Sequence, residues 1–310
     1  MKKKIKRICG VLLTVLLIFG MVQYAGYRLK PKSLENTYCQ IQAFHMLPDN
    51  SVDVMVYGSS HSWNGFDVNV LTQQYGISAY NYSCMWQHMN TTRLFLKDSL
   101  ETQSPKVVLI ETYIPEILAD ENMNGEIYYS RYLPDSPARR EYLKQCFAGD
   151  WGRYVSYYFP LVAFHESWED IDYKSYMPLS DNISLFSQSR GFLGKDDVVP
   201  VEIPGRTKYQ YDLPEDSVAV LDDMVALCHE KGIEVIFYTI PSGMKNHYAD
   251  AFKQYAEQRG CAYVNLFDKV EECGIDENTD FLDKGHLNVN GAKKVAAYMG
   301  QYITDNYDLK

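Results

Sequence analysis

Apolar positions divide the chain into one uniform N-terminal stretch and a longer region in which short apolar runs alternate with periodic segments. The first stretch runs from Ile8 to about Val22 and extends to Tyr27, roughly 15 to 20 residues, just enough to cross a bilayer. From residue 51 onward, runs typical of buried parallel strands are separated by segments with helical spacing. This alternation predicts βαβ units, which build a mostly parallel sheet with helices on both faces.

Five apolar runs are the predicted strands, and they cover residues 52–57, 77–83, 106–112, 234–240 and 262–266. Helical spacing predicts helices over 66–75, 91–101, from near 215 to Gly232, and over 248–259. One face of a last helix carries Ala292, Val295, Ala296, Met299 and Ile303. We therefore expect a three-layer α/β/α domain with a mostly parallel sheet.

Residues 113–214 interrupt the alternation. They hold twelve tyrosines and two of the four tryptophans, with weak periodicity, which is too much chain for an ordinary connection. We interpret them as an inserted cap over the carboxyl ends of the strands, the edge at which open α/β sheets bind ligands. A second packing layer with no ligand role is the alternative.

The N-terminal apolar stretch is preceded by five basic residues, Lys2, Lys3, Lys4, Lys6 and Arg7. This layout is typical of a signal peptide or a signal anchor, and the alternative is a buried helix of a soluble protein. No small-x-small cleavage site lies near residues 20–27, which favours an anchor. The positive-inside tendency then keeps the basic flank cytoplasmic and places the chain from about residue 30 outside the cell membrane.

These boundaries give the predicted organisation of a single-pass membrane protein. Residues 1–7 are the cytoplasmic flank, 8–27 the transmembrane anchor, 28–50 a linker and lead-in, and 51–310 an extracytoplasmic domain with the inserted cap at 113–214. A net charge of -10 leaves no basic face to replace phosphate counterions, so nucleic acid is not an expected partner. The seven cysteines and the scattered histidines lack metal-type spacing, and we expect no metal and no cofactor.

Two short segments carry the candidate chemistry. Gly58-Ser59-Ser60-His61-Ser62 directly follows the first predicted strand, and Asp283-Lys284-Gly285-His286 precedes the last helix. A serine hydroxyl is a poor nucleophile at neutral pH, so it needs a base within hydrogen-bond reach and a third group that fixes the tautomer of that base. His286 and Asp283 can supply both functions.

In these two segments the chain resembles the SGNH/GDSL hydrolase superfamily, whose first block is a strand followed by Gly-x-Ser and whose last block is Asp-x-x-His before the final helix. The resemblance covers roughly residues 52–112 and 215–305 and implies an acyl-enzyme mechanism. It assigns Ser60 as the nucleophile, with Asp283 and His286 as its activating pair. Ser59 and Ser62 are then candidates for helix caps, and His61 for a substrate contact or a supporting neighbour.

The chain departs from the superfamily at the oxyanion hole. Relatives carry a glycine in a second block and an asparagine in a third, whereas this chain has Asn81-Tyr82-Ser83-Cys84-Met85-Trp86-Gln87-His88 and Glu111-Thr112-Tyr113-Ile114 at those places. The oxyanion-hole candidates are therefore Ser60, Ser83, Trp86, Gln87 and Asn90. The candidates for substrate binding are His61, Tyr113, His165 and Trp168, and a purely structural role is the alternative for His165.

An N-terminal anchor combined with these departures resembles the divergent branch that holds teichoic-acid D-alanylation proteins of the DltD type and exopolysaccharide O-acetylation proteins. The resemblance implies a serine acyltransferase or esterase acting on O-acyl groups of a cell-envelope glycan or teichoic-type polymer, with a membrane-bound O-acyltransferase as an expected partner. Two alternatives stay open. One is a carbohydrate or lipid esterase that uses water, and the other is a catalytically silent relative that binds glycan or scaffolds an acylation complex.

Overall fold

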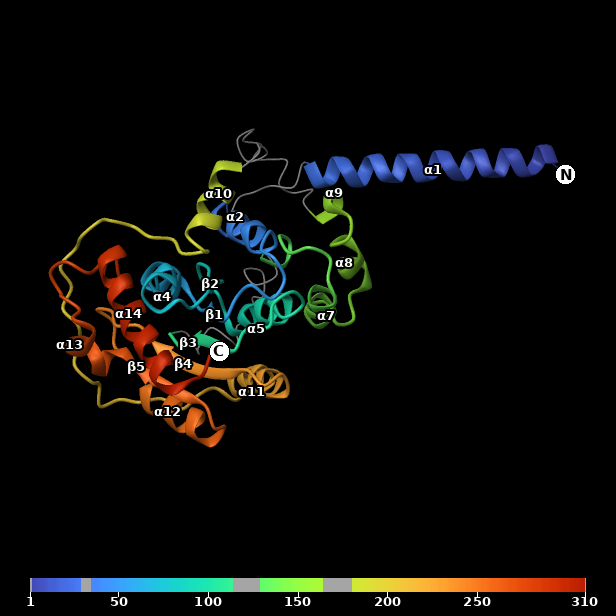
Figure 1. Cartoon of the computed structure of the whole chain (residues 1–310). Helices are drawn as coiled ribbons and strands as arrows, with labels where there is room; N and C mark the ends of the chain where they lie inside the picture. Colours follow the sequence, from blue (N-terminus) through green and yellow to red (C-terminus); the bar gives the residue numbers. More distant parts are fainter. Residues whose placement is uncertain (1, 29–34, 114–128, 164–179, 310) are drawn as a thin grey trace.

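The computed structural model describes residues 2–28, 35–113, 129–163 and 180–309. Its centre is a five-stranded, fully parallel sheet with the strand order β2-β1-β3-β4-β5. The strands are β1 (Val54–Tyr57), β2 (Ala79–Asn81), β3 (Val107–Glu111), β4 (Glu234–Thr239) and β5 (Ala262–Asn265). The predicted α/β class with a parallel sheet is confirmed, and Figure 1 shows helices on both sides of the sheet.

One face of the sheet packs against α4 (Asn69–Tyr75) and α14 (Val289–Asn306). Alternate strand residues such as Val54, Val56 and Leu109 point to this face. The apolar row predicted for the last helix, from Ala292 to Ile303, is completely buried. Strand neighbours alternate between faces, so the continuous apolar runs are explained by a sheet covered on both sides.

The other face packs against α5 (Met89–Ser99), α11 (Glu215–Glu230) and α12 (Ala249–Gln258). It receives the alternate residues Met55, Tyr57 and Phe237. The remaining short elements of this half of the chain are η4 (Leu266–Lys269) and α13 (Val270–Cys273). All five predicted strands and the helices expected between them are present, and most of their ends lie within about three residues of the predicted ones.

Before β2, the structure has two helices that the sequence pattern did not predict. Residues that fell in the predicted linker form α2 (Glu35–Phe44), and the serine-rich segment after β1 forms α3 (Ser60–Gly65). Gln40 explains why α2 belongs to the folded domain, because its buried amide nitrogen donates to the carbonyls of Asn81, Ser83 and Gly191. An isolated polar residue in a short amphipathic segment gives no sequence signal for such a contact.

The described parts of residues 113–214 form α7 (Pro137–Cys146), α8 (Trp151–Ser156), α9 (Pro160–Ala163) and α10 (Ser180–Gln188). α7 packs on α5 and α10 packs on α2, so these two helices extend the outer helical layer. Residues 114–128 and 164–179 lie outside the described residues, and the role of the insertion as a cap stays a prediction.

The N-terminal helix α1 (Lys2–Arg28) extends away from the domain in Figure 1. Among the described helices, it is the one long and apolar enough to cross a membrane, with a mean hydropathy of 2.2 over its most apolar window. A signal sequence would satisfy the same criteria of length and composition. Whether the helix is retained and how it is oriented therefore belong to the proposal below.

Candidate active site

A pocket of about 480 Å³ opens at the carboxyl edge of the sheet. This is the size range of small-molecule sites and the edge at which parallel α/β sheets bind ligands. Ser60 and His61 contribute from the end of β1, and Gly285 and His286 from the loop before α14. The remaining lining residues are Trp86, Tyr113, Thr239, Met244, Lys245, Asn246, His247, Tyr248 and Phe267.

The chain turns sharply where β1 meets α3, and Gly58 makes this turn possible. A Cβ atom at Gly58 would lie 2.4 Å from the Cβ of Glu111 and 2.8 Å from that of Ser62, closer than packed carbon atoms approach. Ser59 then caps α3, because its hydroxyl accepts from the backbone N–H of His61 at 3.3 Å. Ser60 is the first helical residue, so its own N–H has no acceptor within the helix.

The structure brings Ser60, His286 and Asp283 into one chain of hydrogen bonds. The Oγ of Ser60 lies 2.8 Å from Nε2 of His286, although 226 positions separate the two residues. On the other side of the ring, Nδ1 lies 2.9 Å from Oδ1 and 3.0 Å from Oδ2 of Asp283. The carboxylate thus fixes the tautomer in which Nε2 is free to accept the serine proton.

The loop that carries the histidine is held by its own turn. Oδ1 of Asp283 accepts from the backbone N–H of Gly285 at 2.7 Å and of His286 at 3.0 Å. Partial burial raises the pKa of Asp283, but these bonds and the imidazole outweigh it, so the pKa lies below its ordinary value. Asp283 is therefore a carboxylate at neutral pH even though its side chain is 54% exposed.

Asn288 closes this loop and begins α14. Its Oδ1 accepts from the N–H groups of Asn290 and Gly291 and so caps the helix. Its amide nitrogen donates to the carbonyls of Thr279 at 2.8 Å and Asp197 at 3.1 Å. The residue is 1% exposed, so this single side chain fixes both ends of the loop that presents His286.

Behind Ser60 lies a buried carboxyl group, Glu111, at a place where the sequence analysis noted only a missing asparagine. Glu111, at the end of β3, accepts from the Oγ of Ser59 at 2.9 Å and from the Ser59 N–H at 3.2 Å. Burial raises its pKa to about 7, although the two bonds from Ser59 oppose the shift. Glu111 therefore holds Ser59, the residue before Ser60, and its pKa lies near neutral pH.

Ser62 belongs to a buried hydroxyl chain under the turn. Its Oγ lies 2.5 Å from the hydroxyl of Tyr238 and accepts from Ser83 at 3.0 Å. These groups come from three different strand ends, so the hydroxyl chain ties the turn after β1 to the sheet. Of the three serines near the end of β1, Ser59 caps the helix, Ser62 joins this buried chain and Ser60 alone lines the pocket.

His61 packs against the catalytic candidates without entering their hydrogen-bond chain. Its ring centroid lies 3.5 Å from that of Tyr113 and 4.8 Å from that of His286. The side chain is buried, and Nδ1 finds no hydrogen-bond partner among the described residues. Burial, followed by the nearby His286, lowers the pKa of His61 to about 3, so the ring is neutral at physiological pH. His61 and Tyr113 form one wall of the pocket.

The predicted oxyanion-hole residues lie in different environments. Ser83 uses its N–H for Asn81 and its hydroxyl for Ser62, and the buried Gln87 donates its amide to Thr92. Asn90 accepts from Arg93 and is absent from the pocket lining. Trp86 does line the pocket, and its φ of 51° turns the chain sharply there. The side chains of Ser83, Gln87 and Asn90 are thus engaged inside the fold.

Sequence reasoning missed the contribution of the end of β4 and of the chain that follows it. Thr239, Asn246 and Tyr248 line the pocket from this segment. Their position, from the end of a predicted strand to the start of the helix that follows it, is at the carboxyl edge of a parallel sheet, and this is the signal that would have found them. Two predicted substrate contacts, His165 and Trp168, lie outside the described residues. Among the described residues, no group of three or more His, Cys, Asp or Glu side chains is arranged to hold a metal ion.

Comparisons with known proteins do not identify a family or an activity for this chain. No protein-family model and no curated protein matches the chain. Among solved structures it is similar to a protein from Bacteroides fragilis described as a "putative acylhydrolase". The two are 13% identical with a TM-score of 0.41, over 87% of this chain and 95% of that chain. An identity and a TM-score this low establish neither a common family nor a common activity.

Proposed function

We propose that this protein is a serine esterase or acyltransferase of the SGNH type that works through an acyl-enzyme. The observation that carries the proposal is the contact of 2.8 Å between Ser60 Oγ and His286 Nε2, with Asp283 on the opposite ring nitrogen. The contact lies within the range in which a base takes a proton from a nucleophile. It also lies in a pocket large enough for an acyl group and part of an alcohol.

The proposed reaction has two halves that use the same three side chains. His286 takes the proton of Ser60 as the serine oxygen attacks the carbonyl carbon of an ester, and a tetrahedral oxyanion forms. The oxyanion collapses, the bond to the alcohol breaks, and His286 returns the proton to the departing alcohol. Water or a second alcohol then attacks the acyl-enzyme while His286 again acts as the base, and Ser60 recovers its proton.

The developing oxyanion needs hydrogen-bond donors near Ser60. The backbone N–H of Ser60 itself, unused within α3, is the first proposed donor. The backbone around Trp86, which reaches the pocket, is the proposed place for the second. Removing one such donor from a hydrolase costs about 2.7 to 4 kcal/mol of transition-state stabilisation, so a site with few donors would turn over slowly.

The proposed setting is the outer surface of the cell membrane. α1 is long and apolar enough to serve as the anchor, and the basic residues before it favour a cytoplasmic N-terminus. An anchored domain acts on substrates of the envelope, so we propose O-acyl groups of a glycan or teichoic-type polymer as the substrate class. A membrane-bound O-acyltransferase that supplies the acyl group is the proposed partner, on the basis of the family resemblance alone.

Covalent labelling tests the nucleophile. A fluorophosphonate probe should label the full-length protein in detergent, Ser60→Ala should abolish labelling, and Ser184→Ala on the exposed face of α10 should leave it unchanged. His286→Ala should slow labelling strongly because the base is lost. Equal labelling of the Ser60→Ala variant would disprove the assignment of the nucleophile.

Two measurements, probe labelling and acyl release, separate the transferase, the esterase and the catalytically silent relative. The engagement of Ser83, Gln87 and Asn90 inside the fold favours a catalytically silent, glycan-binding relative. That relative would leave the wild-type protein unlabelled. If the protein labels, acyl release should be measured with and without a polyol. A transferase diverts the acyl group to the polyol, whereas an esterase releases the free acid at the same rate in both.

A further inference from the structure

Beside the N-terminal helix, an apolar surface is formed by α8, α9 and the residues that join them. We call it the aromatic platform and define it by Trp151, Tyr154, Val155, Tyr158, Phe159 and Val162. Three of its side chains are exposed although they are apolar, Trp151 by 70%, Val155 by 44% and Val162 by 53%. A group of large apolar side chains left open to solvent indicates a contact surface.

The platform is in contact with the candidate anchor. The ring of Phe159 meets that of Phe19 edge to face, with centroids 6.0 Å apart. Four residues further along α1, the amide of Gln23 donates to the carbonyl of Tyr158 at 2.9 Å. Phe19 belongs to the apolar span of α1 and Gln23 lies near its end. Tyr158 and Phe159 of the platform are therefore level with the point at which a spanning helix leaves the hydrocarbon.

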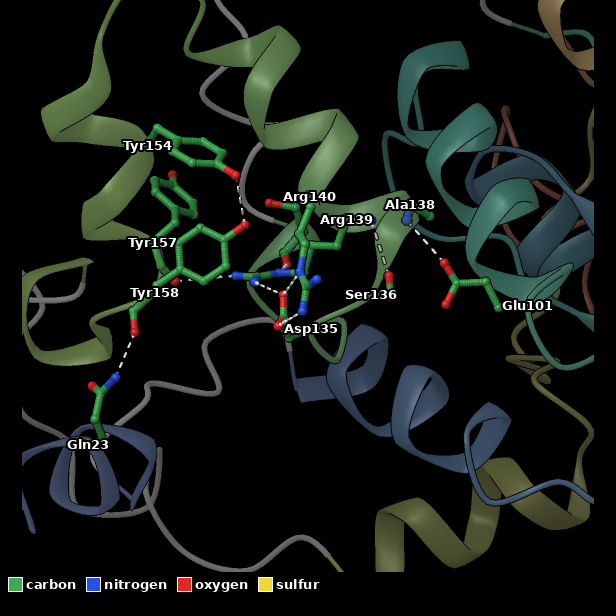
Figure 2. A network of polar contacts seen from close by, with 11 residues as sticks. Gln23, Glu101, Asp135, Ser136, Ala138, Arg139, Arg140, Tyr154, Tyr157 and Tyr158 are labelled. Atoms are coloured by element: carbon green, nitrogen blue, oxygen red, sulfur yellow. Dashed lines mark hydrogen bonds and ion pairs between the residues drawn. The ribbon is translucent and has the colours of Figure 1, made fainter. Parts of the chain in front are cut away.

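The platform is also fixed to the catalytic domain, as Figure 2 shows. The hydroxyl groups of Tyr154 and Tyr158 lie 3.2 Å apart. The guanidinium of Arg139 lies over the Tyr158 ring, 5.7 Å from its centroid, and donates to the carbonyl of Tyr157 at 3.4 Å. Arg139 belongs to α7, which is joined to the end of α5 by the bond from the Ala138 N–H to Glu101 at 3.0 Å. Continuous contacts thus link α1 to the sheet.

The chemistry of this surface matches the headgroup region of a bilayer. Tyrosine and tryptophan rings concentrate where hydrocarbon meets headgroups, because each has an apolar body and one polar group. Exposed basic side chains on α8 and on the neighbouring α7 include Arg153 and Lys144, and such groups bind lipid phosphates. A bilayer around α1 would also extend sideways from Phe19 to Phe159, so the platform continues a surface already facing lipid.

From these contacts we propose that the aromatic platform is a second membrane contact, which lies in the headgroup region of the same leaflet that α1 leaves. The domain is then held at a fixed height and tilt rather than carried on a free tether. The inference rests on the anchor in the proposed function and adds to it. It also favours retention of α1, because cleavage of a leader would leave Phe159 and the Tyr158 carbonyl without these contacts.

Fluorescence quenching in vesicles tests the platform. The full-length protein is reconstituted into vesicles of equal parts phosphatidylcholine and phosphatidylglycerol, with and without bromine on the acyl chains. The Trp151→Phe variant gives the emission of the other tryptophans. The difference between the emission of the native protein and that of this variant is the signal of Trp151. In the Trp151→Phe background, Leu16→Trp supplies an anchor reference within α1, and Tyr209→Trp supplies a water reference at an exposed position before α11. Acrylamide is the quencher that reports water.

We expect brominated lipid to quench the Trp151 signal several-fold more than the water reference, and acrylamide to quench it less. If Trp151 behaves like the water reference while lipid quenches the anchor reference, the platform is in water and the inference is wrong, although the anchor stands. Shielding of Trp151 from both quenchers would also overturn the inference, since protein would then cover the surface. If brominated lipid does not quench the anchor reference, α1 does not lie in the bilayer, and both the proposed anchor and the platform inference are wrong.

Discussion

Residues 58–62, which hold the proposed nucleophile and are called the nucleophile turn, meet residues 281–288, which hold the proposed base and are called the base loop, in one hydrogen bond. The two segments are built in different ways. The turn is almost entirely buried and is held by Glu111, Tyr238 and Ser83, which come from other strands. The base loop is largely exposed at Asp283, whose carboxylate holds the turn around His286. The rest of the loop is tied to the domain by Asn288 and by the bond from the Gly243 N–H to the Lys284 carbonyl. The position of Ser60 therefore depends on the whole sheet, whereas the orientation of the His286 ring depends mainly on the turn held by Asp283.

The largest expected effect tests the base loop. Asp283→Asn removes the charge that stabilises the imidazolium and favours the wrong tautomer, so esterase activity or the rate of fluorophosphonate labelling should fall on the order of 10³-fold or more. Thermal stability should barely change, since the side chain is half exposed. Asp305→Asn, an exposed residue at the end of α14, is the control. A full rate in Asp283→Asn would show that the local turn alone orients His286.

The next effect belongs to the nucleophile turn and depends on pH. Burial raises the pKa of Glu111 from an ordinary value of 4.5 to about 7. Between these values the folded chain keeps a proton that the unfolded chain has released, so stability falls as pH rises and the full loss is present above 7. At 1.36 kcal/mol per pKa unit the loss is about 3 kcal/mol.

Glu111→Gln cannot ionise, so its stability relative to wild type should rise between pH 5 and pH 8 by roughly that amount. Thermal melts of the two proteins in one detergent, at both pH values, measure the difference. The exposed Glu257→Gln is the matched control and should show no such change. A difference that is the same at both pH values would mean that Glu111 is not a buried acid, and the contrast between the two regions would weaken.

A smaller effect sharpens the role of Gly58. A methyl group there meets Cβ atoms at 2.4 and 2.8 Å, and neither neighbour is the mobile end of a long side chain. Gly58→Ala should therefore cost about 2 to 3 kcal/mol of stability through overpacking, and it should displace Ser60 and slow labelling. Gly205→Ala, with open space around the new methyl group, is the control. Unfolding in urea measures both, and equal stabilities would contradict the close approach.

The smallest expected effect returns to the base loop. Asn288→Ala removes the cap of α14 and the amide bonds to the carbonyls of Asp197, Thr279 and Phe281, which should cost about 1 to 2 kcal/mol and lower activity moderately as the loop loosens. Asn288→Asp keeps the cap oxygen but not the donor, so it should recover part of the stability. The exposed Asn290→Ala serves as the control. If Asn288→Ala loses stability without any change in rate, the cap has no part in presenting His286.

Sequence reasoning located the strands and most helices because their apolar periodicity is local and repeated. It also selected Ser60, Asp283 and His286, since two short segments with the right spacing stood at the right ends of predicted elements. It did not find Glu111 as the partner of Ser59, or Thr239, Asn246 and Tyr248 as pocket residues. Those assignments depend on which strand ends are neighbours, and one sequence does not give the strand order.

The sequence by itself determined the alternating α/β class, the apolar N-terminal helix and the local turn that orients His286, because each follows from contacts between residues close along the chain. Only the tertiary structure decided that Ser60 and His286 lie 2.8 Å apart, that Glu111 is buried behind them and that α9 meets α1. Burial and long-range neighbours set these distances and pKa values, and both are properties of the folded chain.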